Sequence, residues 1–351
     1  MNSSTVDNYF SKKITILSFF LCCGVVSQHV KWTCLDYETL NSIRDFWFFI
    51  VETCVPFFFI VSGYLFFRTY QSDNWKKKLK SRINSLLVPY LLWNVFYSVV
   101  MLLLFKAGFV TNIQRKEGLL GVVTSCINSE YSPLWFIKDL MVFVCISPMM
   151  YYLLRNKYVG ALVLIALVTV NANNFYSGRM TEPLNVNAND WIMFIYQYIF
   201  FALGSYGALC WKLDIEKSSS KRAICGLIML SFLIIIYWAY LCSNGDVINN
   251  HTFRWLWCIS FWFAYDLFPE IRVYPWMKYS FFIYCAHLII VMCIQGVSQK
   301  VFSYCGGLTC CLQITEYIAL PIVTIICIIC IANLLKKHMP QLLLIITGGR
   351  G

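Results

Sequence analysis

Apolar stretches long enough to cross a lipid bilayer recur along this chain from residue 14 to residue 335, with short polar connections between them. A helical span needs about 20 such residues, because the hydrocarbon core of a membrane is about 30 Å thick. With 59% hydrophobic and only 13% charged residues, the chain cannot be wrapped inside one water-soluble core. In lipid, every backbone polar group needs a partner within the chain. The sequence therefore predicts an all-α fold, a polytopic integral membrane helical bundle.

The apolar pattern predicts about ten spans. No polar block between them is long enough to fold alone, so residues 1–351 are expected to form a single membrane-embedded domain with no fused soluble domain. No internal repeat is visible, and nothing suggests the inverted halves of a secondary transporter. The expected spans are roughly 14–33, 46–67, 86–106, 134–152, 158–172, 190–211, 223–242, 252–268, 279–297 and 316–335.

The basic residues predict the orientation of these spans. Net charge is +11, yet most Lys and Arg residues lie in loops between apolar runs, a pattern typical of membrane topology and not of nucleic-acid binding. An even number of spans places both termini on one side. That side carries 19 basic residues against 8 on the other, so the termini are expected to face the cytosol.

The cysteines predict packing and no metal site. Most of the 17 lie inside apolar runs, where Cys behaves as a small hydrophobe. Cys34 and the Cys305, Cys310, Cys311 group lie in loops, at a spacing that matches no zinc pattern. A disulfide there stays an open alternative.

A few ionisable groups lie inside apolar runs, where a charge costs a few kcal/mol and therefore indicates an internal pair or cavity. His29, late in the first expected span, and Glu52, early in the second, come to matching depth and are candidates to pair. A carboxylate that fixes an imidazole tautomer is a usual way to build a general base. The alternatives are a packing histidine at His29 and a helix-capping or outer-loop carboxylate at Glu52.

Other polar residues form a second group of candidates. Lys138 lies near the outer start of the fourth expected span, beside Asp139. His287 lies midway along the ninth, one helical turn after Tyr284, so the two share a face. A basic cluster of Trp75, Lys76, Lys77, Lys78, Lys80 and Arg82 is either a topology signal and lipid-headgroup anchor or a receptor for the phosphates of a cytosolic donor.

Five separated segments resemble, in order, the acyltransferase-3 family of membrane-bound acyltransferases, and the resemblance spans nearly the whole chain. They are a first-span segment ending in His, an "FF-x-x-SG" signature, a basic loop running into Pro-Tyr, a Trp-Phe segment and a late Tyr-x-x-His. The segments are "ITILSFFLCCGVVSQH" (14–29), "VPFFFIVSGYLF" (55–66), "KLKSRINSLLVPYLLW" (78–93), "PLWFIKDL" (133–140) and "SFFIYCAH" (280–287).

The resemblance implies transfer of an acyl group, most often acetyl from acetyl-CoA as co-substrate, to a hydroxyl of a cell-surface polysaccharide or lipid-linked glycan. It implies an enzyme of the bacterial inner membrane with no bound cofactor. The matching positions are His29, Ser62 with Gly63, Arg82, Trp135 with Phe136, and His287. We therefore expect His29 and Glu52 to be catalytic and Arg82, Lys78, Lys138 and Trp135 to bind the donor, with Ser62, Tyr284 and His287 as further candidates.

Two positions depart from the family pattern. Ser18 occupies the position where the family usually has Arg, eleven residues before the first-span His, and Ser85 stands where a second loop Arg is expected. A cation in the first span would bind the donor or stabilise developing negative charge. Its work passes to Lys138, Lys13 or a basic loop residue, or the chain is a divergent or inactive member.

Two rival functions stay open at this point. A transporter or flippase of a lipid-linked sugar is also an aromatic-rich bundle with few buried charges, and it would move glycan without consuming acyl-CoA. A sensor or assembly partner would leave glycan acylation unchanged when deleted.

The charge asymmetry makes a testable prediction about topology. Enzyme reporters fused within residues 72–82 should report the cytosol, and reporters fused within residues 110–130 should report the opposite side. A cytosolic signal from both regions would contradict the ten-span arrangement.

Overall fold

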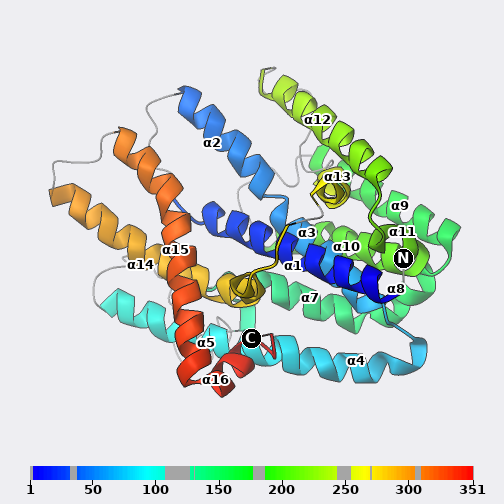
Figure 1. Ribbon diagram of the computed structural model, residues 1–351, viewed down its shortest axis with the longest axis horizontal. Helices are drawn as coiled ribbons and strands as arrows, with labels where there is room; N and C mark the ends of the chain where they lie inside the picture. Colours follow the sequence, from blue (N-terminus) through cyan, green and yellow to red (C-terminus); the bar gives the residue numbers. More distant parts are fainter. Residues whose placement is uncertain are drawn as a thin grey trace. The chain divides into compact units, whose positions relative to one another are not determined.

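The computed structural model describes residues 3–31, 38–106, 127–129, 131–176, 186–242, 254–268, 271–304 and 310–350. Their regular secondary structure is helical and includes no strand, which confirms the predicted all-α fold (Figure 1). The helices are α1 (Ser3–Gln28), α2 (Glu38–Val51), α3 (Cys54–Phe67), α4 (Trp75–Arg82), α5 (Val88–Lys106), α7 (Trp135–Cys145), α8 (Ser147–Leu154), α9 (Lys157–Tyr176), α10 (Val186–Cys210), α11 (Lys212–Glu216), α12 (Ser220–Cys242), α13 (Arg254–Ala264), α14 (Ser280–Tyr304), α15 (Cys310–His338) and α16 (Pro340–Ile346), with short turns η1 (Ser72–Asn74), η2 (Ile83–Leu87), η4 (Tyr265–Leu267) and η5 (Pro275–Tyr279).

Length and composition confirm a multi-pass helical membrane protein, whereas the count of ten spans stays a prediction. Within the described residues, six segments are long and apolar enough to cross a membrane, and a seventh is added if the bent pair α7 and α8 counts as one span. Two shorter apolar segments, Lys157–Val170 and Phe194–Cys210, coincide with further predicted spans. The six are Asp7–Gln28, Arg44–Phe67, Ser72–Lys106, Ser220–Trp238, Pro275–Phe302 and Leu312–His338.

Several of the predicted spans are interrupted and do not form one continuous helix. The span over 134–152 bends by 65° between α7 and α8, because Pro148 supplies no N–H to the preceding turn. The π-helical turn η2 ends two residues before Pro89, which likewise has no N–H to donate. The span over 46–67 is interrupted by a turn at Glu52 and Thr53.

Two sequence predictions concern residues outside the described ranges. Cys34 and Cys305 lie there, so the open question of a loop disulfide stays open. The outer loop at 110–130 falls almost entirely outside the described residues as well, and its side of the membrane stays a prediction.

The chain forms two compact units, each built from separated stretches. Unit 1 contains residues 1–17, 53–75 and 143–273, and unit 2 contains residues 18–52, 76–142 and 274–351. Because both units draw on the beginning, middle and later parts of the sequence, neither is a contiguous domain. The single membrane-embedded domain stays a prediction.

Within unit 1, α3 and α10 approach each other closely at two glycines. A β-carbon added to Gly204 would lie 1.9 Å from the carbonyl oxygen of Ile60, and one added to Gly63 would lie 2.2 Å from that of Phe201. The residue numbers run in opposite directions across the two contacts, as in an antiparallel pair. Small residues that let helix backbones touch are a common packing device in lipid. Ser62, a predicted site candidate, is therefore followed by a packing glycine.

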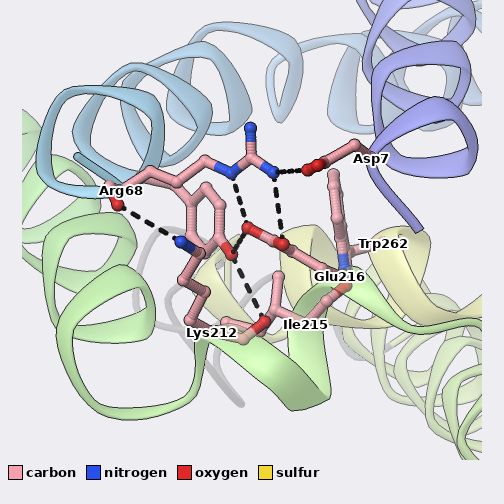
Figure 2. A network of polar contacts seen from close by, with 7 residues as sticks. Asp7, Arg68, Lys212, Ile215, Glu216 and Trp262 are labelled. Atoms are coloured by element: carbon pink, nitrogen blue, oxygen red, sulfur yellow. Dashed lines mark hydrogen bonds and ion pairs between the residues drawn. The ribbon is translucent and has the colours of Figure 1, made fainter. Parts of the chain in front are cut away.

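Arg68 is the centre of an ionic network in unit 1 (Figure 2). Its Nε donates to Oε1 of Glu216 at 2.6 Å and its Nη2 donates to Oε2 at 3.2 Å. Nη2 also donates to Asp7, and the Tyr64 hydroxyl donates to Glu216 at 2.9 Å. Because each of these charges has an opposite partner, the network joins α1, α3 and α11 and needs no ligand to balance it.

A second ion pair of unit 1 is buried. Lys13 Nζ donates to Oδ1 of Asp266 at 2.6 Å, and both side chains are 1% exposed. The Tyr9 hydroxyl and the backbone N–H of Ser219 also donate to Asp266, at 2.5 and 3.1 Å. Lys13 further lies 4.1 Å from the ring centroid of Trp262. Lys13, one of the residues considered as a substitute for a first-span cation, is thus committed to the packing of unit 1.

In unit 2, α14 is bonded to several segments that are distant in sequence. The Tyr97 hydroxyl on α5 donates to the backbone oxygen of Cys285 at 2.9 Å. Gln295 exchanges two hydrogen bonds with the backbone of Lys31, at 3.0 and 3.3 Å. Helix α15 lies beside α14 (Figure 1), and Ser298 donates to Glu316 across the pair. These bonds fix the rotation of α14 and hence the direction in which its polar side chains project.

The glycine contact predicts a position-specific loss of stability. Gly204→Ala should lower the thermal unfolding midpoint of the detergent-solubilised protein, because the added methyl group meets backbone and overpacking costs about 1–3 kcal/mol. Gly296→Ala on α14 is the control, since nothing lies within 4 Å of its added β-carbon. There the change should be neutral or stabilising, because Ala favours a helix over Gly by about 1 kcal/mol. Equal midpoints for the two variants would contradict the close approach.

The ionic network predicts a different loss. Glu216→Gln should destabilise the protein by about 2 kcal/mol, because the charged hydrogen bonds to Arg68 become neutral ones. The control is Asp214→Asn, whose side chain is 60% exposed and pairs with Arg222 at 3.4 Å. Exposed pairs contribute about 0–1 kcal/mol, so this control should hardly move the unfolding midpoint.

Candidate active site

Two histidines from distant parts of the sequence meet in unit 2. His29 directly follows α1, and His287 lies on α14; their ring centroids are 4.8 Å apart. His287 is completely buried, whereas His29 is partly exposed. Both are candidates from the sequence, which predicts a pairing of His29 with Glu52 and places His287 in a separate group with Tyr284. The structure therefore joins two candidates into one imidazole pair.

The tautomer of His287 follows from its hydrogen bond. Nδ1 lies 2.7 Å from the backbone oxygen of Tyr284. A carbonyl oxygen only accepts, so Nδ1 carries the hydrogen and Nε2 bears a lone pair. Among the described residues, Nε2 is buried without a hydrogen-bond partner. This arrangement leaves a proton-accepting nitrogen inside the helical bundle.

Tyr284 is held beside this pair by its own hydroxyl. The hydroxyl donates to the backbone oxygen of Pro133 at 2.7 Å, and its ring centroid is 6.2 Å from that of His287. The prediction that Tyr284 and His287 share a face of one helix is consistent with this separation. Since its proton is engaged by Pro133, Tyr284 positions the start of α7 next to the imidazole pair.

Glu52, the predicted partner of His29, lies in the turn between α2 and α3. Its backbone N–H donates to the oxygen of Phe48 at 2.9 Å, and its side chain is partly buried. Both Glu52 and His29 belong to unit 2. A pairing of the carboxylate with the imidazole stays a prediction.

Trp135 and Lys138 lie one helical turn apart at the beginning of α7. Both side chains are exposed, and α7 starts two residues after Pro133, whose backbone oxygen accepts the hydrogen bond from Tyr284. The geometry places these two donor-binding candidates on the segment that the tyrosine anchors. Their role in binding stays a prediction.

Lys78 and Arg82, the other donor-binding candidates, lie one turn apart on α4. Arg350, which is not among the candidates from the sequence, follows α16 and lies close enough to Arg82 for the two positive charges to interact. Its guanidinium carbon is 4.4 Å from the ring centroid of Phe281 on α14. In the sequence, only the glycine pair Gly348–Gly349 distinguishes this segment. The proximity of Arg350 to Arg82, some 270 positions earlier, cannot be predicted from the residues around Arg350.

Unit 1 contains an apolar cavity that is separate from these residues. Its volume is about 480 Å³, and aromatic and aliphatic side chains such as Phe57 and Trp262 line most of it. Its charged members, Asp214 and Arg222, pair with each other at 3.4 Å. The cavity suits an apolar chain but offers no constellation of catalytic groups. Across the described residues, no three His, Cys, Asp or Glu side chains are grouped as metal ligands.

Comparison with known proteins supports the family resemblance. The acyltransferase domain of the acyltransferase-3 family matches residues 12–333. The chain is also similar to the succinoglycan biosynthesis protein ExoH of Rhizobium meliloti (strain 1021), with 22% identity over 379 residues, covering 98% of this chain and 94% of the relative. No solved structure matches. The match over nearly the whole length, on a multi-pass helical fold, shows that the chain belongs to the acyltransferase-3 family of membrane acyltransferases.

Proposed function

We propose that this protein is a membrane O-acyltransferase that moves an acyl group, acetyl in the first instance, from acyl-CoA to a hydroxyl of a cell-surface polysaccharide or lipid-linked glycan. Family membership supports the transfer chemistry. The similarity to a succinoglycan biosynthesis protein supports a polysaccharide or its precursor as the acceptor. The bacterial inner membrane, with both termini cytosolic, is the matching location because acyl-CoA is a cytosolic donor.

The observation that carries this proposal is the imidazole pair. Acyl transfer to a hydroxyl requires a base that accepts the hydroxyl proton. His29 is the partly exposed member of the pair and can meet a substrate, while His287 is buried behind it with a fixed tautomer. A buried imidazole with an unpartnered Nε2 is unusual as mere packing, because an unsatisfied polar atom costs about 1–3 kcal/mol.

The reaction then follows the chemistry of a thioester. His29 takes the proton as the acceptor oxygen attacks the thioester carbonyl carbon. The carbon–sulfur bond breaks, and the imidazolium returns the proton to the departing CoA thiolate. Glu52 serves to orient His29 and to stabilise its protonated form, and His287 buttresses the His29 ring. The products are a glycan ester and free CoA.

The donor is held by the basic residues of unit 2. Arg82 and Lys78 supply positive charge for its phosphates, while Lys138 and Trp135 contact the donor from the start of α7. Lys138 lies on the same segment as the Tyr284 contact, so it is the better remaining substitute for the first-span cation now that Lys13 is engaged by Asp266.

The proposal predicts that His29→Ala abolishes acylation while the protein still accumulates in the membrane. Loss of a general base typically lowers the rate by about 10² to 10⁴. Glu52→Gln should cause a smaller loss, because an amide can still hold one tautomer but cannot stabilise an imidazolium. The measurement is the ester content of glycan from a deletion strain that expresses each variant, together with acyl-CoA consumption by its membranes.

His338→Ala is the matched control, because His338 is an exposed histidine at the end of α15. Near-normal ester content with His29→Ala would remove His29 from the mechanism and leave His287 with Tyr284 as the acid–base pair. Glycan from the deletion strain that keeps its full ester content would favour a transporter or an assembly partner instead.

A further inference from the structure

The chain reverses sharply after α16. Gly348 and Gly349 both have positive φ values, +60° and +81°, which glycine adopts without strain. Gly349 N–H donates to the oxygen of Leu344 at 2.7 Å, and Gly348 N–H donates to that of Ile345 at 3.2 Å. These bonds satisfy the last carbonyl groups of the helix, as in a glycine-terminated helix cap.

This turn packs directly against the π-helical turn η2. A β-carbon on Gly348 would lie 2.2 Å from the backbone oxygen of Ser85, so only glycine fits there. The indole of Trp93 on α5 donates to the backbone oxygen of Ile346 at 3.0 Å and holds the end of α16 in place. The segment after α16 is therefore a docked part of unit 2.

The packing of this turn places the Arg350 guanidinium where its positive charge is unfavourable. Burial, and then the neighbouring charge of Arg82, lower the pKa of Arg350 to about 10, so its guanidinium remains charged at neutral pH. Within the described part of the chain, Arg350 forms no ion pair; its close contact is the Phe281 ring. Holding two like charges together costs free energy that a bound anion would offset.

The position of this arginine pair relates it to the histidines. Phe281, Tyr284 and His287 succeed one another at intervals of three on α14, with ring centroids 6.4 and 6.2 Å apart. Arg350 covers the first of these rings, and His287 lies about 9 Å further along the helix axis. A ligand with an anionic group at one end and its reacting group on a flexible arm could lie along these three side chains, with the anion at Arg350 and the reacting group near His287.

We propose that Arg350, placed by the Gly348–Gly349 turn, joins Arg82 in a paired-guanidinium site for the phosphates of the acyl-CoA donor. The inference rests on the proposed acyltransferase function and adds a residue from the far end of the chain to its donor site. Paired guanidinium groups suit phosphate because each presents N–H donors in a planar fork. A phospholipid headgroup carries the same chemistry, and the experiment separates the two sources.

The test compares two acyl donors with the full-length protein in nanodiscs. Arg350→Gln should raise the KM for acetyl-CoA about tenfold or more, because a charge-assisted contact is lost. The rate with S-acetyl-N-acetylcysteamine, which has no phosphate, should stay at the wild-type value. Arg350→Lys should restore part of the acetyl-CoA affinity. Arg155→Gln is the control, since Arg155 is exposed and also lies over aromatic rings.

A second variant moves Arg350 without removing its charge, and the rate with the phosphate-free donor reports whether that variant is still folded. Gly348→Ala keeps every charge but forces the turn away from Ser85, so it should raise the KM for acetyl-CoA in the same way. Wild-type protein that acylates with both donors establishes the reaction independently. An unchanged KM in both variants would then overturn the site. A KM that is unchanged while the dependence on phosphatidylglycerol in the nanodisc is lost would assign the pair to a lipid headgroup and overturn the donor assignment.

Discussion

Hydrocarbon offers the peptide backbone no hydrogen-bond partner, and this constraint shapes both the helices and the places where they stop. Where a helix is interrupted, backbone N–H and C=O groups lose their partners within the helix and need other hydrogen-bond partners nearby. The π-helical turn before Pro89 lies between Arg82 and α5 and receives the Gly348 turn. The break between α2 and α3 holds Glu52. Arg82 and Glu52, two candidate site residues, thus lie where the hydrogen bonds of the helix backbone are interrupted. The unpaired backbone groups there already require a polar environment.

The two units treat buried charge in opposite ways. In unit 1, Lys13 with Asp266 and Arg68 with Glu216 and Asp7 neutralise each other over short distances. In unit 2, the positive charges of Arg82 and Arg350 repel each other, and the imidazole rings of His29 and His287 lie 4.8 Å apart with their planes tilted by 50°. Opposite charges at short distance stabilise the fold, whereas like charges at short distance favour the binding of a ligand of opposite charge. The ion pairs of unit 1 therefore stabilise its own fold, whereas the chemistry that we propose involves residues of unit 2.

Much of this arrangement was accessible from the sequence. The apolar pattern predicts the all-helical fold, and the segments ending at His29 and His287 indicate the family. The meeting of these histidines was missed because apolar periodicity fixes neither the rotation nor the vertical offset of one helix against another. Pro89 and Pro148 indicate the interruptions in the sequence, but each lies within a run of apolar residues that by itself predicts one continuous span. Arg350 depends on contact with residues some 270 positions away, which no local pattern encodes.

The bond from His287 to the backbone oxygen of Tyr284 has a consequence for how such a site can vary. In many enzymes a side chain orients the histidine, and one substitution can remove that control. Here the orienting group is the peptide itself, present whatever residue occupies position 284. Mutation can delete the imidazole, but no single exchange at another position can remove its acceptor. The tautomer of His287, with the hydrogen on Nδ1 and the lone pair on Nε2, is therefore set by the backbone of α14 and not by another side chain.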